Sequence, residues 1–139
     1  MIRVCRQTEL AVRPEDESVA LTDALEILAA RGIDVIAHSL YADWKGMVLL
    51  VVTEDVRRAQ RALEATGFKC ESNPVIMVEA REQVGVVASL GVQLHQAGVP
   101  IEYSHMATSS DEMYFAVFKT GDDDGALRAL RADIQSAAA

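Results

Sequence analysis

The side chains best able to bind a metal or to attack a substrate are the histidines, the cysteines and the serines. His38, His95 and His105 fit no H-E-x-x-H spacing, and no Cys/His spacing typical of a zinc site occurs. Cys5 and Cys70 form no CxxC pair, and neither has the basic or helix-start setting that favours a thiolate. No G-x-S-x-G motif presents a serine nucleophile. The sequence therefore predicts no catalytic residue, no metal site and no cofactor.

One glycine stands where anion binding would need it. Gly85 opens the segment 85–97, in which apolar residues recur at helical spacing. A glycine at the start of a helix lets backbone amides approach a negatively charged group. The amides of Val84 to Val86 are thus a candidate anion site, and a plain strand-to-helix turn is the alternative explanation of this glycine.

The composition argues against several classes of protein. The chain has 139 residues, of which 50% are hydrophobic, so it can bury a core. Its net charge is −8 and its Lys and Arg residues form no basic stripe, which argues against nucleic-acid binding. The charged opening MIRVCRQTEL is unlike an export signal, and no run of about 18 apolar residues predicts a membrane span. We therefore expect a cytoplasmic protein whose cysteines are free thiols.

Hydrophobic periodicity and turn residues predict an order of elements that occurs twice. The first pass predicts strands at 9–13, 33–42, 47–53 and 68–71, with helices at 19–31 and 54–66. The second pass predicts strands at 75–80, 100–107 and 113–119, with helices at 85–97 and 122–133. Residues 1–5 could extend the first strand, and residues 134–139 are a weak candidate for the last one.

The two passes align at an offset of about 66 residues, with Gly32 opposite Gly98 at the end of equivalent helices. Internal repeats are strong evidence on architecture. We therefore predict an α+β fold with two ferredoxin-like βαββαβ units, at residues 1–73 and 74–139. Each unit would be a four-stranded antiparallel sheet with two helices on one face. Each sheet leaves an edge open, which favours a homodimer.

The succession of strand, loop, helix, glycine stop and hairpin resembles the ACT domain. The first copy carries it in ELAVRPEDESVALTDALEILAARGIDVIAHSL and the second in VIMVEAREQVGVVASLGVQLHQAGVPIEYSHM. The resemblance covers nearly the whole chain, from about Thr8 to Asp133. A tandem pair in so short a chain resembles stand-alone paired ACT proteins of the amino-acid-binding type, and it leaves no room for a catalytic domain.

The resemblance implies that an amino acid or a related metabolite binds at the loop before the first helix and at the start of the second strand. The ligand-binding residues that it implies are Asp16, Ser18, Asp34, Gln83, Val84, Gly85 and Val86. The first loop departs from the family, which prefers Pro-Gly before Leu21, because this chain has Ser18-Val19 there. Asp34 could accept a hydrogen bond from a ligand ammonium, whereas the matching Pro100 could not. We expect one composite site, with a usable half from each copy, or two unequal sites.

The sequence favours a non-catalytic regulatory module that binds a small molecule, and it leaves two alternatives open. The chain could be a ligand-free structural or interaction subunit of a larger complex, with a protein partner that the sequence does not identify. It could also be an acylphosphatase-like hydrolase, which shares the βαββαβ layout. That enzyme needs an arginine in a phosphate-binding loop after the first strand. Arg81 has this place, but the loop that follows it is short and acidic.

Overall fold

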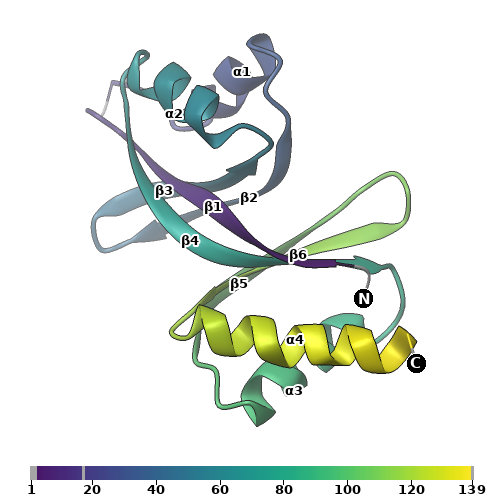
Figure 1. Ribbon diagram of the computed structural model, residues 1–139. Coiled ribbons are helices and arrows are strands. Elements are labelled where there is room, and N and C mark those ends of the chain that lie inside the picture. The colour runs from purple at the N-terminus through teal and green to yellow at the C-terminus, as the bar shows by residue number, and fades with distance from the viewer. Residues whose placement is uncertain (1–2, 17, 139) are drawn as a thin grey trace. The chain divides into compact units, whose positions relative to one another are not determined.

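The computed structural model describes residues 3–16 and 18–138, and it describes no side chain beyond residue 132. The strands are β1 (Arg3–Pro14), β2 (Val35–Asp43), β3 (Gly46–Thr53), β4 (Phe68–Arg81), β5 (Ile101–Thr108) and β6 (Met113–Thr120). The helices are α1 (Asp23–Ala30), α2 (Val56–Glu64), α3 (Val86–Gln96) and α4 (Asp123–Ala138) (Figure 1). The predicted fold class, α+β with two ferredoxin-like units, is confirmed.

The chain divides into two compact units, and the division is not a single cut through the sequence. The first unit is Thr8–Asn73, and the second unit combines Met1–Gln7 with Pro74–Ala139. β1 and β4 therefore each contribute residues to both units. The expected division into residues 1–73 and 74–139 assigned residues 3–7 to the first unit, whereas in the structure they group with the second.

In the first unit the strand order is β2-β3-β1-β4. β3 is antiparallel to both of its neighbours, and its Val51 lies opposite Leu10 of β1 and His38 of β2. Because it lies between two strands, β3 is buried from Val48 to Thr53, as its apolar sequence requires. α1 and α2 cover one face of this sheet (Figure 1). The core beneath them includes Leu10, Val12, Leu28, Leu49, Val51, Leu63 and Phe68.

In the second unit the strand order is β1-β4-β6-β5, and α3 and α4 lie on one face of the sheet (Figure 1). β4 and β6 are antiparallel, with Val78 opposite Ala116. The part of β1 that belongs to this unit also contributes to its core, because Val4 is only 6% exposed and packs there. The other core residues include Ile76, Val78, Leu90, Leu94, Phe118, Ala126 and Leu130.

The prediction of a last strand at residues 134–139 is wrong, because α4 continues as a helix to Ala138. Residue 139 lies outside the described residues. This end of the chain is rich in alanine, leucine and arginine, which are strong helix formers. The place beside β4 that the expected strand would have taken is filled by β1. β1 begins at Arg3, which confirms the predicted extension of the first strand over residues 3–5.

Equivalent helices of the two units end in the same way. Gly32 follows α1 and Gly98 follows α3, and both have left-handed backbone, with φ of 68° and 72°. The N–H of Ile33 donates to the carbonyl of Leu28 over 2.9 Å, and the N–H of Val99 donates to that of Leu94 over 3.0 Å. Both bonds are those of a Schellman motif, which needs a left-handed residue and therefore favours glycine. The local geometry thus repeats with the offset seen in the sequence.

We expect Val4→Asp to destabilise the second unit far more than the first. A carboxylate in this apolar core would have no partner, at a cost of about 3 kcal/mol or more. Amide hydrogen exchange distinguishes the units: protection should fall in α3 and β6 and persist in α2 and β3. The control Arg3→Gln changes an exposed side chain of the same strand, which pairs with Glu79, and should cost about 1 kcal/mol at most. Unchanged protection in α3 and β6 would contradict the assignment of β1 to this core.

Candidate functional site

In the first unit the turn from β1 to α1 borders a cavity of about 480 Å³. The cavity is lined by Arg13, Pro14, Glu15, Asp16, Val19, Leu21, Lys45, Gly46 and Met47. The turn is fixed to the rest of the unit by its backbone, since the N–H of Glu15 donates to the carbonyl of Gly67 over 2.9 Å. The lining combines apolar side chains with charges of both signs, a composition suited to a small polar ligand.

Asp16 and Ser18, both predicted as ligand-binding residues, are bonded to each other. The carboxylate of Asp16 accepts a hydrogen bond from the N–H of Ser18 over 2.8 Å and another from its hydroxyl. The hydroxyl of Ser18 and, to a smaller extent, its amide lower the pKa of Asp16, so this carboxylate is ionised at neutral pH. Both donors of Ser18 are therefore used within the loop, and a ligand would meet the negative charge of Asp16.

Two cations that the sequence analysis did not single out border the same cavity. Arg13 binds Asp43 with two hydrogen bonds, of 3.2 Å to Oδ1 and 2.6 Å to Oδ2. These bonds lower the pKa of Asp43 and raise that of Arg13. The ammonium of Lys45 lies 5.0 Å from the centroid of the Trp44 ring and forms no ion pair within the described part of the chain. Lys45 is therefore the more available cation for a ligand carboxylate.

In the second unit the turn from β4 to α3 borders a cavity of about 190 Å³. The four predicted residues Gln83, Val84, Gly85 and Val86 line it together with Ser89, Leu90 and Gln93. Gly85 immediately precedes α3 with left-handed backbone, φ 89°. An added Cβ at this glycine would meet no atom within 4 Å, so the need for glycine is conformational.

The start of α3 leaves amide donors unused. The N–H of Val86 donates to the carbonyl of Gln83 over 3.3 Å, and the first bond of the helix runs from the N–H of Ser89 to the carbonyl of Gly85 over 3.0 Å. Within the described residues no side chain caps this helix, and the amides of Val87 and Ala88 have no backbone partner. The amides best placed for an anion are therefore those of Val87 and Ala88, just beyond the predicted Val84 to Val86.

Gln93 brings an acceptor to the same cavity. Its Nε2 donates to the hydroxyl of Ser89 over 3.0 Å. Its Oε1 is buried and has no hydrogen-bond partner among the described residues. An unpaired buried carbonyl oxygen is costly and rare in native structures. The turn and helix that border the cavity thus carry free amide donors, on Val87 and Ala88, and an unpaired acceptor, on Gln93.

Within the first unit, Asp34 does not border the cavity of the loop that holds Asp16 and Ser18. It is exposed and borders a separate cavity of about 400 Å³ with Leu25, Ala29, Gly32, Ile33 and Val35. Asp16 precedes α1 and Asp34 follows it, so the two carboxylates stand at opposite ends of that helix. The structure does not bring them into one cavity. Because Asp34 and Gly85 belong to different units, their partnership stays a prediction.

Chemically reactive groups are few in the part of the chain that the structure describes. No group of three or more His, Cys, Asp or Glu residues is placed there to hold a metal ion. Cys5 and Cys70 are free thiols. Burial, with a smaller contribution from Glu64, raises the pKa of Cys70 to about 11, so this thiol is protonated and unreactive at neutral pH. None of the described helices has the length and apolarity needed to cross a membrane.

Comparison with known proteins defines the fold. No family model and no curated protein matches the chain. A crystal structure of a protein from Bacteroides thetaiotaomicron matches with a TM-score of 0.78 and 21% identity, over 94% of this chain and 90% of that one. The aspartokinase α and β subunits match with a TM-score of 0.61 and 15% identity, over 95% and 97% of the two chains. The regulatory subunit of aspartate kinase from Thermus thermophilus matches with a TM-score of 0.59 and 18% identity, over 93% and 95%.

At these identities the likeness establishes the fold alone, which this chain shares with the regulatory subunit of aspartate kinase, and it supports the predicted ACT-like architecture. The site residues that the sequence analysis missed are Arg13 and Lys45 in the first unit and Ser89 and Gln93 in the second. Ser89 and Gln93 follow Gly85 at intervals of four, so helical spacing from the glycine was a usable signal. No such local signal joins Arg13 to Lys45, because strand pairing brings them to the same cavity.

We expect Gly85→Ala and Gly91→Ala to change stability in opposite directions. Gly85 has left-handed backbone, so alanine there should lower the free energy of unfolding by about 1 kcal/mol. Gly91 lies within α3 with open space around an added Cβ, so alanine there should raise it by about 0.5 kcal/mol. Chemical denaturation of the two variants checks this pair. Equal stability of the Gly85→Ala variant and the parent would show that the loop does not hold this conformation.

Proposed function

We propose that the protein is a non-catalytic regulatory module that binds a small amino acid or a related metabolite. The observation that carries the proposal is a duplicated arrangement. In each unit, the turn from the first strand of the ACT fold into its first helix borders a cavity. The likeness in fold to regulatory subunits of aspartate kinase supports the regulatory part of the proposal.

In the second unit the ligand carboxylate would bind the amides of Val87 and Ala88. The dipole of α3 favours negative charge at this end of the helix. The Oε1 of Gln93, which is unpaired and closed to solvent, would turn into the cavity to accept a hydrogen bond from the ligand ammonium, which removes the cost of leaving it unpaired. Gln83, Val84, Gly85 and Val86 would form the wall of the site. A few charge-assisted hydrogen bonds can supply the affinity of about −8 to −4 kcal/mol that micromolar to millimolar sensing needs.

The first unit would offer an unequal second site. There Lys45 would bind the ligand carboxylate and Asp16, oriented by Ser18, would bind the ammonium. The nearby Glu15 makes this cavity less favourable to an anion than that of the second loop, whose described lining holds no charged residue. Asp34 keeps its proposed role as an acceptor for an ammonium group, at its own cavity.

Regulation requires a surface that reports the ligand to a partner. A ligand shifts a conformational balance only by its differential affinity for the two states. The β2–β3 hairpin supplies an exposed apolar surface, on which Trp44 is 89% exposed and Tyr41 is 41% exposed. A second copy of this chain, or another protein, would cover it. The same surface favours the alternative of an interaction subunit, and free cysteines fit a cytoplasmic setting.

No specific observation favours the hydrolase alternative. Arg81 ends β4 opposite Met113, and it is not among the described residues that line the cavity of the second loop. An arginine outside the cavity cannot hold a phosphoryl group there. We therefore do not propose catalysis.

A thermal-shift screen of the full chain against the twenty amino acids tests the proposal. We expect at least one of them to raise the melting temperature at millimolar concentration. A ligand that binds only the native state stabilises it by about 2.7 kcal/mol when its concentration is a hundred times its Kd. If none of the twenty changes the melting temperature, an amino-acid ligand is ruled out as the regulator.

Two variants test whether the ligand identified in the screen binds at the second loop. Gln93→Met keeps the length of the side chain and removes the acceptor, so the ligand-induced shift should shrink. The matched control Gln60→Met changes a partly exposed glutamine of α2, which donates to Glu64, and should leave the shift unchanged. Gly85→Glu sets a carboxylate against the free amides and should abolish the shift. A full shift in Gly85→Glu would mean that the ligand binds elsewhere.

A further inference from the structure

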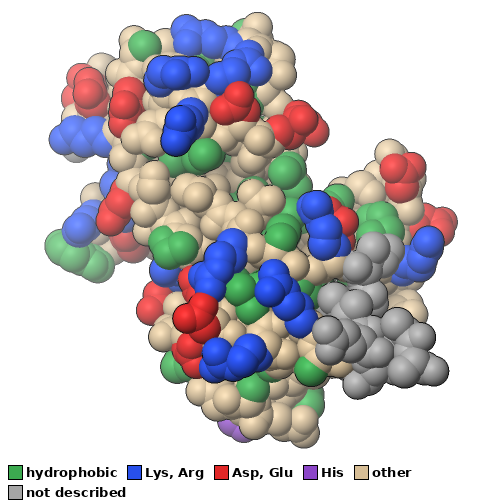
Figure 2. Space-filling view, in the orientation of Figure 1, with side chains coloured by type: hydrophobic (Ala, Val, Ile, Leu, Met, Phe, Trp, Pro, Cys, Tyr) green, Lys and Arg blue, Asp and Glu red, His purple; other side chains and the backbone are tan. Residues whose placement is uncertain are grey.

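Three arginines surround a separate cavity of the second unit. The cavity has a volume of about 280 Å³ and is lined by Arg6, Asp124, Leu127, Arg128 and Arg131. Arg6 comes from β1, and the other four residues come from α4. Figure 2 shows Lys and Arg side chains gathered over α4, with acidic side chains beside them. This cavity shares no lining residue with the cavity of the second loop.

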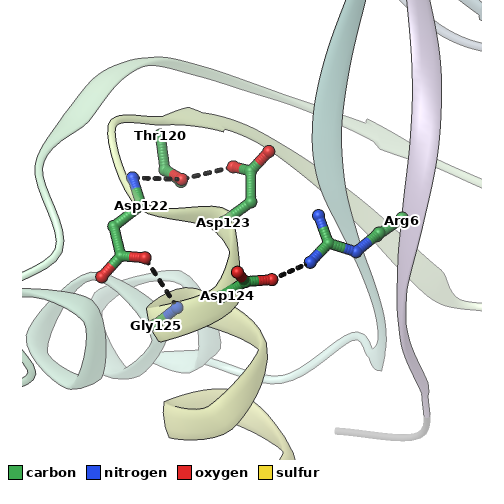
Figure 3. Close-up of polar contacts among 6 residues, drawn as sticks. All are labelled: Arg6, Thr120, Asp122, Asp123, Asp124 and Gly125. Carbon is green, nitrogen blue, oxygen red and sulfur yellow. Dashed lines mark hydrogen bonds and ion pairs between the residues drawn. The ribbon is translucent and has the colours of Figure 1, made fainter.

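The charges around this cavity are not balanced within the described residues. Asp124, the one carboxylate that lines it, forms an ion pair with Arg6, as Figure 3 shows. The two side chains are 52% and 74% exposed, so water screens their attraction. Arg128 and Arg131 form no ion pair with any described residue. They stand three positions apart on α4, where like charges lie close and repel each other.

Hydrogen bonds and packing fix the start of α4, the helix that carries Arg128 and Arg131. Asp122 accepts a hydrogen bond from the N–H of Gly125 over 2.9 Å, and Thr120 accepts one from the N–H of Asp122 over 3.2 Å (Figure 3). Leu127, at 6% exposure, and the fully buried Leu130 fix the helix against the core. The arginine side chains thus extend from a capped and packed helix rather than from a loop.

We propose that this arginine cluster, Arg6, Arg128 and Arg131, binds a small anion with two or more negative charges, of the pyrophosphate or phosphate-ester class. Guanidinium groups bind phosphate oxygens through paired hydrogen bonds, and an anion between them removes the repulsion of Arg128 and Arg131. Arg6 can turn from Asp124 to the ligand because their exposed pair is weak. The size of the cavity suits a small anion, and the net charge of −8 disfavours a long polyanion such as nucleic acid.

Calorimetric titration of the full chain with sodium pyrophosphate at low ionic strength tests the assignment. We expect saturable binding at one site that weakens as salt is added. The variant R128Q/R131Q should bind at least about tenfold more weakly. Asp124→Asn removes the competing carboxylate and should bind more tightly. The control R57Q/R61Q removes the same charge from exposed positions of α2 and should bind as the parent does.

The assignment is overturned by any of three results. The first is that pyrophosphate does not saturate a site. The second is that R57Q/R61Q loses as much affinity as R128Q/R131Q, which would reduce the effect to net charge. The third is that a single-stranded oligonucleotide binds more tightly than pyrophosphate through the same arginines. All of the exchanged side chains are exposed, so we expect every variant to fold. Unchanged melting temperatures will verify this. The amino-acid screen does not test this cavity. A negative screen would therefore contradict the proposed amino-acid site and leave the proposed anion site unaffected.

Discussion

The start of the chain completes the sheet of the second unit, and the other features of that unit depend on this strand. Residues 74–120 provide three of its strands, and β1 provides the fourth, beside β4. Val4 is buried in the core, and Arg3 pairs with Glu79 over 2.7 Å on the outside. Arg6, from the same strand, reaches the first turn of α4. One short segment therefore closes the core and brings Arg6 to the cavity that Arg128 and Arg131 line.

The two units share a backbone and differ in the chemistry of their first loops. The loop of the first unit is charged, and its Asp16 and Ser18 satisfy each other. The cavity of the second loop has no charged residue in its described lining, and beyond Gly85 the amides of Val87 and Ala88 have no backbone partner. A zwitterion needs donors for its carboxylate and an acceptor for its ammonium, and α3 carries both kinds of group, on Val87 and Ala88 and on Gln93. The asymmetry expected from the missing glycine of the first loop is thus an asymmetry of free hydrogen-bonding groups.

The features that the sequence predicts well are local ones. Gly32 and Gly98 end their helices because a left-handed residue is needed within one turn, and the hairpins follow from short apolar runs around a turn. The end of α4 was mispredicted because the repeat required a strand where the residues themselves favour a helix. Contacts between distant segments were not predictable: Arg6 and Asp124 are 118 positions apart, and only the pairing of β1 with β4 brings them together. Gln93 could have been predicted as a site residue, because it lies two helical turns after Gly85.

The most direct test of the central claim is a backbone-amide chemical-shift titration of the full chain with the amino acid that stabilises it most. If the start of α3 is the ligand site, the amides of Val87 and Ala88 should show the largest shifts, and these should saturate with the same Kd as the rise in melting temperature. Saturating shifts confined to other segments, such as the β2–β3 hairpin, would contradict the claim that the second loop binds the ligand.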